Sequence, residues 1–209
     1  HPFRSGPDGR DLVHADEDHL REECGIFGIH GHQEAARHVA LGLHALQHRG
    51  QEACGIVSYD GDQFHPHRAV GLVGDAFADE RLMAQMAGNM GIGHVRYATT
   101  GGAGLRNIQP LYADFAFGGL AIAHNGNLTN ALTLRSQLVQ RGCIFQSTSD
   151  SEVIVHLIAI SLYTDVVDKL IDALRQVHGA YSIVALTRDK LIGVRDPWGV
   201  RPLVIGKLD

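Results

Sequence analysis

The chain has 209 residues, 44% of them hydrophobic and 20% charged, a composition that excludes a disordered or fibrous protein. A net charge of -5 argues against nucleic acid as a partner, and no apolar run approaches the roughly 18 residues of a membrane span. Three cysteines without a Cys-x-x-Cys pair exclude a disulfide framework, so we expect a reducing, cytoplasmic compartment.

Residues 1–23 are polar, contain Pro2 and Pro7, and end in acidic residues that include Asp16 and Asp18. They contain no hydrophobic signal region, so export is not expected. Two interpretations remain open for this segment: a disordered tail, or a leader whose meaning depends on the residues that follow.

From Cys24 onward the pattern is that of a folded domain. Short apolar runs bounded by turn residues predict strands at residues 24–29, 55–59, 91–97 and 120–124. Apolar residues spaced three and four apart predict a helix over residues 33–46, which ends before Gly50. A short helix is expected at residues 79–87, and Asp60-Gly61 predicts a hairpin turn.

The second half combines paired helices with strands. Helices are predicted at residues 129–141, with Gly142 as the stop, at 149–162, opened by a capping box of Ser149 and Glu152, and at 165–177. Strands are expected at residues 181–187, 191–194 and 203–205, with a turn at 196–199. This order predicts an α+β fold rather than a regular βαβ alternation. Because the last strand runs almost to Asp209, we expect the segment to stop short of a domain end.

Several patterns with chemical potential have plainer explanations. His44 and His48 have a metal-ligand spacing but no obvious third ligand, so polar helix residues are favoured. His65 and His67 are expected in a loop, and the glycines of residues 101–104 lack the ending of a phosphate-binding loop. We therefore expect no metal site and no nucleotide site in these segments.

Cysteine is the most informative residue type. Cys54 and Cys143 are expected to be small core residues, whereas Cys24 stands where the polar leader meets the fold. If the bond between Glu23 and Cys24 were cleaved, one residue would carry both a thiol and an α-amine with a pKa near 8. A single residue would then supply a nucleophile and its general base.

Six blocks, in order, resemble the glutaminase domain of the glutamine phosphoribosylpyrophosphate amidotransferase family. They are residues 22–28 (EECGIFG), 46–53 (LQHRGQEA), 93–101 (GHVRYATTG), 124–129 (HNGNLT), 148–152 (TSDSE) and 195–203 (RDPWGVRPL). The resemblance implies a four-layer αββα sandwich of the N-terminal nucleophile hydrolase type, with two antiparallel sheets between helix layers. It also implies hydrolysis of the glutamine side-chain amide to glutamate and ammonia. The ammonia would serve phosphoribosylamine formation in the first step of purine synthesis.

The resemblance assigns roles residue by residue. Cys24 would be the nucleophile, with its α-amine as base, and Asn125 and Gly126 would form the oxyanion hole. Arg96 would bind the α-carboxylate of glutamine, and Asp150 its ammonium group. Each has a plainer alternative: a surface charge for Arg96, a helix cap for Asp150, and a type I′ turn for Asn125-Gly126.

Three further positions carry supporting roles by the same resemblance. Tyr97 and Thr99 would help to line the glutamine pocket, and Arg49 would lie close to the nucleophile. Glu23 and Cys24 would flank a cleavage site, cut by attack of the Cys24 thiol on the preceding carbonyl.

The resemblance also sets the expected domains and partners. Residues 1–23 would be a propeptide or disordered leader and residues 24–209 a glutaminase domain, truncated at its C-terminal end. The phosphoribosyltransferase domain, which uses Mg²⁺ with phosphoribosylpyrophosphate, would be absent. L-glutamine is the expected small-molecule partner, and the full-length protein would be a homo-oligomer. No cofactor is expected in this segment, while an iron–sulfur cluster in the full-length protein stays an open question.

Two other functions are weighed. One is a glutaminase that serves another acceptor, as in glucosamine-6-phosphate synthesis. Relatives of that kind usually show Tyr-Arg-Gly-Tyr-Asp where this chain has residues 48–52. The other is an unprocessed, catalytically silent glutamine-binding module, in which the leader stays attached and Cys24 never becomes terminal.

Overall fold

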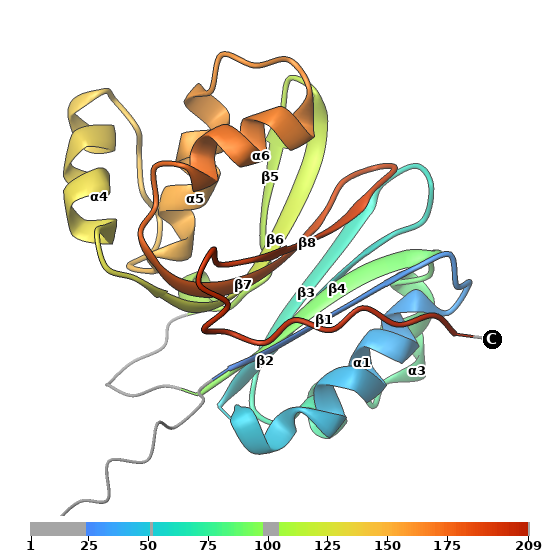
Figure 1. The fold of residues 1–209 in the computed structure, drawn as a ribbon. Helices are drawn as coiled ribbons and strands as arrows, with labels where there is room; N and C mark the ends of the chain where they lie inside the picture. Colours follow the sequence, from blue (N-terminus) through green and yellow to red (C-terminus); the bar gives the residue numbers. More distant parts are fainter. Residues whose placement is uncertain (1–23, 51, 98–104, 209) are drawn as a thin grey trace, which may run out of the picture.

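Two four-stranded antiparallel sheets form the centre of the computed structural model, which describes residues 24–50, 52–97 and 105–208 (Figure 1). The first sheet has the order β1-β4-β2-β3, built from β1 (Gly25–His30), β4 (Met90–Arg96), β2 (Ala53–Tyr59) and β3 (Phe64–Val70). The second has the order β5-β6-β7-β8, built from β5 (Leu111–Phe115), β6 (Gly118–Leu128), β7 (Gly179–Leu186) and β8 (Leu191–Arg195).

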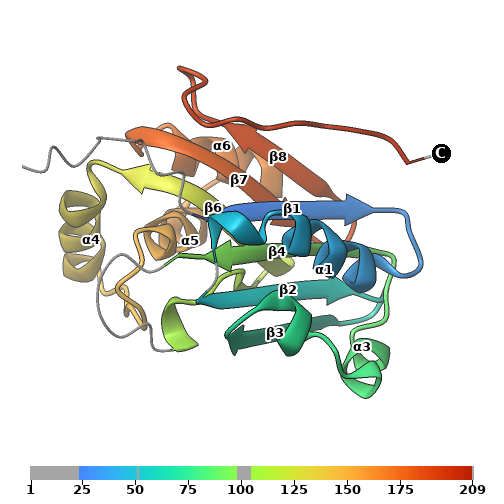
Figure 2. The ribbon, with the colours of Figure 1, turned by 90° about the horizontal axis from the view of Figure 1, so that it is seen from below.

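Helices cover the outer face of each sheet (Figures 1 and 2). On the first sheet lie α1 (Ala35–Ala45), α2 (Val73–Ala76) and α3 (Glu80–Gln85), and on the second α4 (Ala131–Gln140), α5 (Ser151–Ile160) and α6 (Val166–Leu174). Two 3₁₀ turns, Gln47–Arg49 and Leu105–Asn107, connect the larger elements. The expected four-layer sandwich is confirmed.

Three apolar layers hold the four structural layers together. Ile56 of β2 packs toward α1, whereas its neighbour Val57 packs between the two sheets. In β7, Ile183 likewise packs toward the outer helices and Val184 between the sheets. Because successive strand residues point to opposite faces, central strands that are covered on both sides need apolar residues at nearly every position. This explains the continuous apolar runs in the sequence.

Two strands and one helix were missed at the sequence level, namely β3, β5 and α2. The expected loop at His65 and His67 is wrong, because both residues lie in β3. Pro66 lies between them and is opposite Val57 in the register, but β3 is at the edge of its sheet. An edge strand tolerates proline because the missing N–H faces away from the ladder.

The strand expected at residues 203–205 is also wrong. Leu203 packs against the layer between the sheets, but Val204 and Ile205 are each 88% exposed, and no strand is assigned over these described residues. Apolar β-branched residues favour a strand only where a neighbouring strand can pair with them.

Two helix details also differ from expectation. Helix α1 ends at Ala45, so His48 lies in the following 3₁₀ turn and does not share a helix face with His44. Gly142 does end α4, with a positive φ of 90°. None of the helices in the described ranges has the length and apolar character needed to cross a bilayer.

Candidate active site

A cavity of about 560 Å³ is formed where segments far apart in the sequence meet. Four residues with predicted roles line it, namely Cys24, Arg96, Gly126 and Asp150. Cys24 immediately precedes β1 and Arg96 ends β4, so both lie at one end of the first sheet. Gly126 lies in β6 of the second sheet, and Asp150 immediately precedes α5. The cavity is therefore shared by both sheets.

The backbone of Cys24 is held by Arg49. The N–H of Cys24 donates to the carbonyl of Arg49 at 2.9 Å, and Arg49 Nε donates to the carbonyl of Cys24 at 3.0 Å. Gly50 allows this turn to lie against β4, because a Cβ there would come within 2.8 Å of the Arg96 backbone. The arginine expected near Cys24 is thus adjacent to it. Cys24 itself has a φ of 78°, which is uncommon for a residue other than glycine.

Asn125 and Gly126 lie inside β6, so the alternative that they form a tight turn is wrong. Gly126 has a φ of 150°, and a Cβ at this position would come within 2.2 Å of the carbonyl oxygen of Ala180. Only glycine fits here. Asn125 is 5% exposed and lies beside Gly126, but it does not line the cavity.

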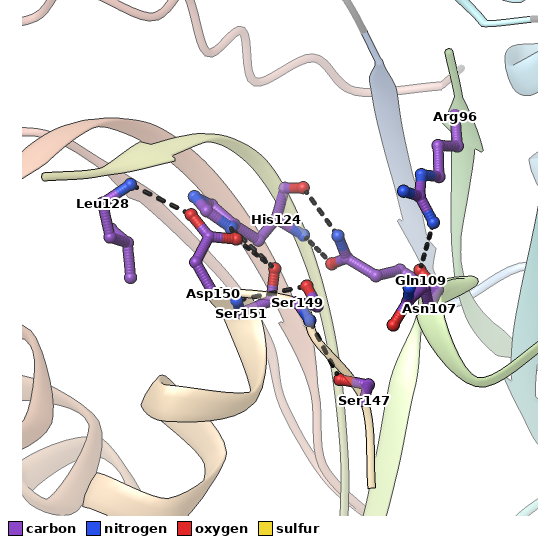
Figure 3. A network of polar contacts seen from close by, with 9 residues as sticks. All are labelled: Arg96, Asn107, Gln109, His124, Leu128, Ser147, Ser149, Asp150 and Ser151. Carbon is purple, nitrogen blue, oxygen red and sulfur yellow. Dashed lines mark hydrogen bonds and ion pairs between the residues drawn. The ribbon is translucent and has the colours of Figure 1, made fainter. Parts of the chain in front are cut away.

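Opposite charges approach the cavity from the end of β4 (Arg96) and from the start of α5 (Asp150). Arg96 Nη1 donates to the carbonyl of Asn107 at 3.3 Å (Figure 3). Asp150 accepts the N–H of Leu128 at Oδ2, at 3.0 Å, and Oδ1 lies 3.8 Å from His124 Nδ1. The side chain of Asp150 makes no cap hydrogen bond to α5, so the helix-cap alternative is wrong.

The predicted capping box is also wrong in its main contact. Ser149 Oγ accepts the N–H of Ser151 at 3.3 Å, as a capping residue would. Glu152, however, accepts the N–H groups of Gln146 and Ser147, both at 2.8 Å. Its carboxylate therefore stabilises the loop before the helix rather than the first residues of the helix.

Two buried histidines next to the predicted residues were missed. His94 and His124 line the cavity and are 1% and 2% exposed. Burial, with the nearby charge of Arg96, lowers the pKa of His94 to about 3, and burial lowers the pKa of His124. Both imidazoles are therefore neutral at pH 7. His124 Nδ1 lies 2.8 Å from Ser151 Oγ. Two-residue alternation along each strand, from Arg96 and from Gly126, could have identified both.

Six other residues line the cavity. Asn127 belongs to β6 and Asn107 to a 3₁₀ turn, and the others come from loops, namely Gln109, Thr148, Ser149 and Arg201. Arg201 belongs to the last sequence block, where buried Asp196 accepts the N–H groups of Trp198 and Val200 at Oδ1 and of Arg201 at Oδ2. Burial tends to raise the pKa of Asp196, but these hydrogen bonds outweigh it and hold the pKa below its usual range.

Among the described residues, Tyr97 is a predicted position that does not line the cavity, and it is 41% exposed. Thr99 and Glu23 lie outside the described residues. Cys54 is buried against the α1 layer and Cys143 packs against the other outer layer, so they do not come together with Cys24. Among the described residues, no three His, Cys, Asp or Glu side chains could together hold a metal ion.

Comparison with known proteins identifies the chain's relatives. A family model described as a glutamine amidotransferase domain matches residues 95–209. The amidophosphoribosyltransferase of Rhizobium etli is 58% identical over 194 residues, which cover 93% of this chain and 39% of that protein. The chain thus spans about two fifths of the length of this relative. The amidophosphoribosyltransferase of Lacticaseibacillus casei is 48% identical, with 90% of this chain and 96% of that sequence covered.

A solved structure supports the same relationship. The chain is similar to the glutamine phosphoribosylpyrophosphate amidotransferase from B. subtilis in complex with ADP and GMP. The TM-score is 0.82 at 44% sequence identity, over 88% of this chain and 39% of that one. The order and pairing of the strands described above therefore belong to a known enzyme fold. The chain belongs to the amidophosphoribosyltransferase family of glutamine amidotransferases.

Proposed function

We propose that residues 24–209 form a glutaminase domain that hydrolyses the side-chain amide of glutamine. In this reaction the Cys24 thiol attacks the amide carbon, and the α-amine of the same residue accepts the thiol proton. The oxyanion that forms would be stabilised by the N–H of Gly126, which lines the cavity and would contribute roughly 3 kcal/mol. The resemblance assigns the same role to the amide of Asn125, which is buried beside Gly126. The amine then gives the proton to the leaving ammonia. Water hydrolyses the resulting thioester and releases glutamate.

The observation that carries this proposal is the pair of opposite charges at one cavity with a thiol. Arg96 ends a strand of the first sheet, whereas Asp150 precedes α5 and bonds to β6 of the second sheet. The two charges match the α-carboxylate and the ammonium group of a free amino acid. A glutamine held at both groups directs its side chain away from them. Cys24 and Gly126 line the same cavity, so that side chain would react there.

The nucleophile requires a free α-amine, so we propose that residues 1–23 are a leader removed between Glu23 and Cys24. The Cys24 nitrogen already lies 2.9 Å from the carbonyl of Arg49. The same contact would orient the amine after cleavage. In this removal the Cys24 thiol would attack the Glu23 carbonyl and the peptide C–N bond would break, which gives a thioester and frees the α-amine. Water would then hydrolyse the thioester and release the leader without another protein.

The relatives' printed names support phosphoribosylpyrophosphate as the acceptor of the ammonia rather than a hexose phosphate. The transfer would take place in the remaining length of the protein, with Mg²⁺ bound beside phosphoribosylpyrophosphate, in a cytoplasmic homo-oligomer. No step of glutamine hydrolysis requires a cofactor in this segment.

The experiment is an intact-mass measurement of the purified chain before and after treatment with a reactive glutamine analogue, together with an ammonia-release assay. Loss of 23 residues and one covalent adduct on Cys24 are expected, with turnover of glutamine. The Cys24→Ala variant should keep its leader, take no adduct and release no ammonia. A full-length mass with no adduct and no ammonia would show an unprocessed, silent module instead. Cleavage of Cys24→Ala at the same bond would contradict the autocatalytic route alone.

A further inference from the structure

The edge of β6 that faces the cavity changes its partner along its length. Strand β5 pairs with β6 up to the match of Leu111 with Ile122. At His124, two residues further on, the side chain of Gln109 takes over (Figure 3). Its Oε1 accepts the His124 N–H at 2.7 Å, and its Nε2 donates to the His124 carbonyl at 3.2 Å. The amide of Gln109 thus makes the two bonds that a strand residue would make.

The same edge carries the proposed oxyanion donor. In a strand, the N–H and C=O groups of every second residue point to the same side. The backbone N–H of His124 points to the β5 side of the strand. The N–H of Leu128 points to the same side and donates to Asp150 at 3.0 Å. Gly126 lies between these two and lines the cavity, so its N–H is directed to the same edge. The bond from His124 to Gln109 on one side and the bond from Leu128 to Asp150 on the other therefore fix the direction of this N–H.

Gln109 is itself rigidly placed. It is 7% exposed and lies where the two sheets meet. Its carbonyl oxygen lies against Gly55 of β2, where a Cβ would come within 2.3 Å. Its side chain, by contrast, bonds to β6 in the other sheet. Gln109 therefore connects the first sheet to the strand that carries Gly126.

We propose that Gln109 is a positioning residue that holds the β6 edge so that the Gly126 N–H points at the developing oxyanion. This inference rests on the proposed glutaminase function and adds a determinant of its rate. Gln109 makes no bond to glutamine in this scheme. Its effect would appear in the transition state, where the oxyanion exists, and not in the binding of glutamine.

The test replaces Gln109 by methionine, which has a similar length but makes neither hydrogen bond. We expect kcat for glutamine hydrolysis to fall about 10- to 100-fold, with KM changed less than about twofold. The control is Ser58→Ala, which removes another buried side-chain bond, from Ser58 Oγ to the Met86 carbonyl at 2.8 Å, far from the cavity lining. This control should leave kcat within about twofold of the original chain.

A second variant and a second readout keep the test decisive. Gln109→Glu retains an acceptor for the His124 N–H but loses the donor when ionised, so a smaller fall in kcat is expected. Amide hydrogen exchange of His124 should accelerate in Gln109→Met, independently of activity. Unchanged kcat in both variants, or a rise in KM alone, would overturn the proposal. If the original chain released no ammonia, the glutaminase function would fail, whereas accelerated exchange would still test the Gln109 anchor.

Discussion

Glu152 offers a quantitative test of how the cavity wall is built. Its carboxylate accepts the N–H of Gln146 at Oε1, and the N–H and hydroxyl of Ser147 at Oε2, at 2.8, 2.8 and 2.7 Å. The side chain is 12% exposed. The loop held in this way continues directly into Thr148, Ser149 and Asp150, which line the cavity. We therefore predict that Glu152→Gln weakens both the fold and the binding of glutamine.

The magnitude follows from the number of acceptors lost. Glutamine has one acceptor oxygen and one NH₂ group, so one N–H of the loop would face a donor. A hydrogen bond to a charged group contributes about 1.5–3 kcal/mol, and Ser147 is 7% exposed, which limits replacement by water. We expect the free energy of unfolding at pH 7 to fall by about 2–3 kcal/mol. KM for glutamine should also rise about tenfold, which corresponds to a loss of about 1.4 kcal/mol of binding free energy.

The effect has a defined dependence on pH. Burial tends to raise the pKa of Glu152, but the hydrogen bonds from Gln146 and Ser147 outweigh it and hold the pKa below its ordinary value of 4.5. A carboxyl whose pKa is lowered by folding stabilises the protein above the ordinary value and loses this contribution as the pH falls through the folded value. The stability difference between the original chain and Glu152→Gln should therefore shrink below about pH 4.5.

The assay is denaturant unfolding followed by circular dichroism between pH 3 and pH 8, with KM measured at pH 7. Glu80→Gln is the matched control, because Glu80 is an exposed residue of α3 paired with Arg37. It should leave stability and KM unchanged. A difference for Glu152→Gln that stays below about 0.5 kcal/mol, or that is constant across this pH range, would refute the reasoning.

Two further substitutions test the charge and the backbone at the cavity. Asp150→Asn keeps an acceptor for the Leu128 N–H but removes the negative charge, so KM for glutamine should rise about 30-fold, equivalent to about 2 kcal/mol, with kcat changed much less. An unchanged KM in steady-state kinetics would place the ammonium group elsewhere. Gly126→Ala should lower both kcat and the free energy of unfolding, the latter by about 2–4 kcal/mol, because its Cβ would meet the Ala180 carbonyl. Gly74→Ala, where a Cβ meets no atom within 4 Å, is the neutral control for thermal unfolding.

The sequence predicts a helix or a strand best where a single buried face determines which positions are apolar. Helix α1 was predicted because Val39 and Leu43 repeat at helical spacing and are both buried. Strand β3 was missed because it combines Pro66 with polar neighbours, a pattern that only an edge position permits. The segment at Val204 and Ile205 shows the opposite error, since a strand pattern cannot reveal whether a partner strand is present.

The same limit applies to the site. Cys24, Arg96, Gly126 and Asp150 were predicted through the family resemblance, and the structure brings them to one cavity. Gln109 could not be found in this way, because its role depends on where β5 begins and on how closely the chain passes over the other sheet. Arg201 and other loop residues reach the site only because of tertiary contacts, which the sequence pattern does not reveal.

The cavity is shared by two sheets that are joined by an apolar layer, in which small residues such as Ala121 and Ala123 lie beside larger ones such as Tyr59 and Met90. A ligand that contacts both Arg96 and Asp150 connects the first sheet to the second. Its binding and the association of the two sheets are then thermodynamically linked, so occupancy must oppose their separation. A saturating ligand at 100 times its Kd would add about 2.7 kcal/mol to the resistance of the whole domain to unfolding. Substrate concentration would thereby help to set the lifetime of the folded protein.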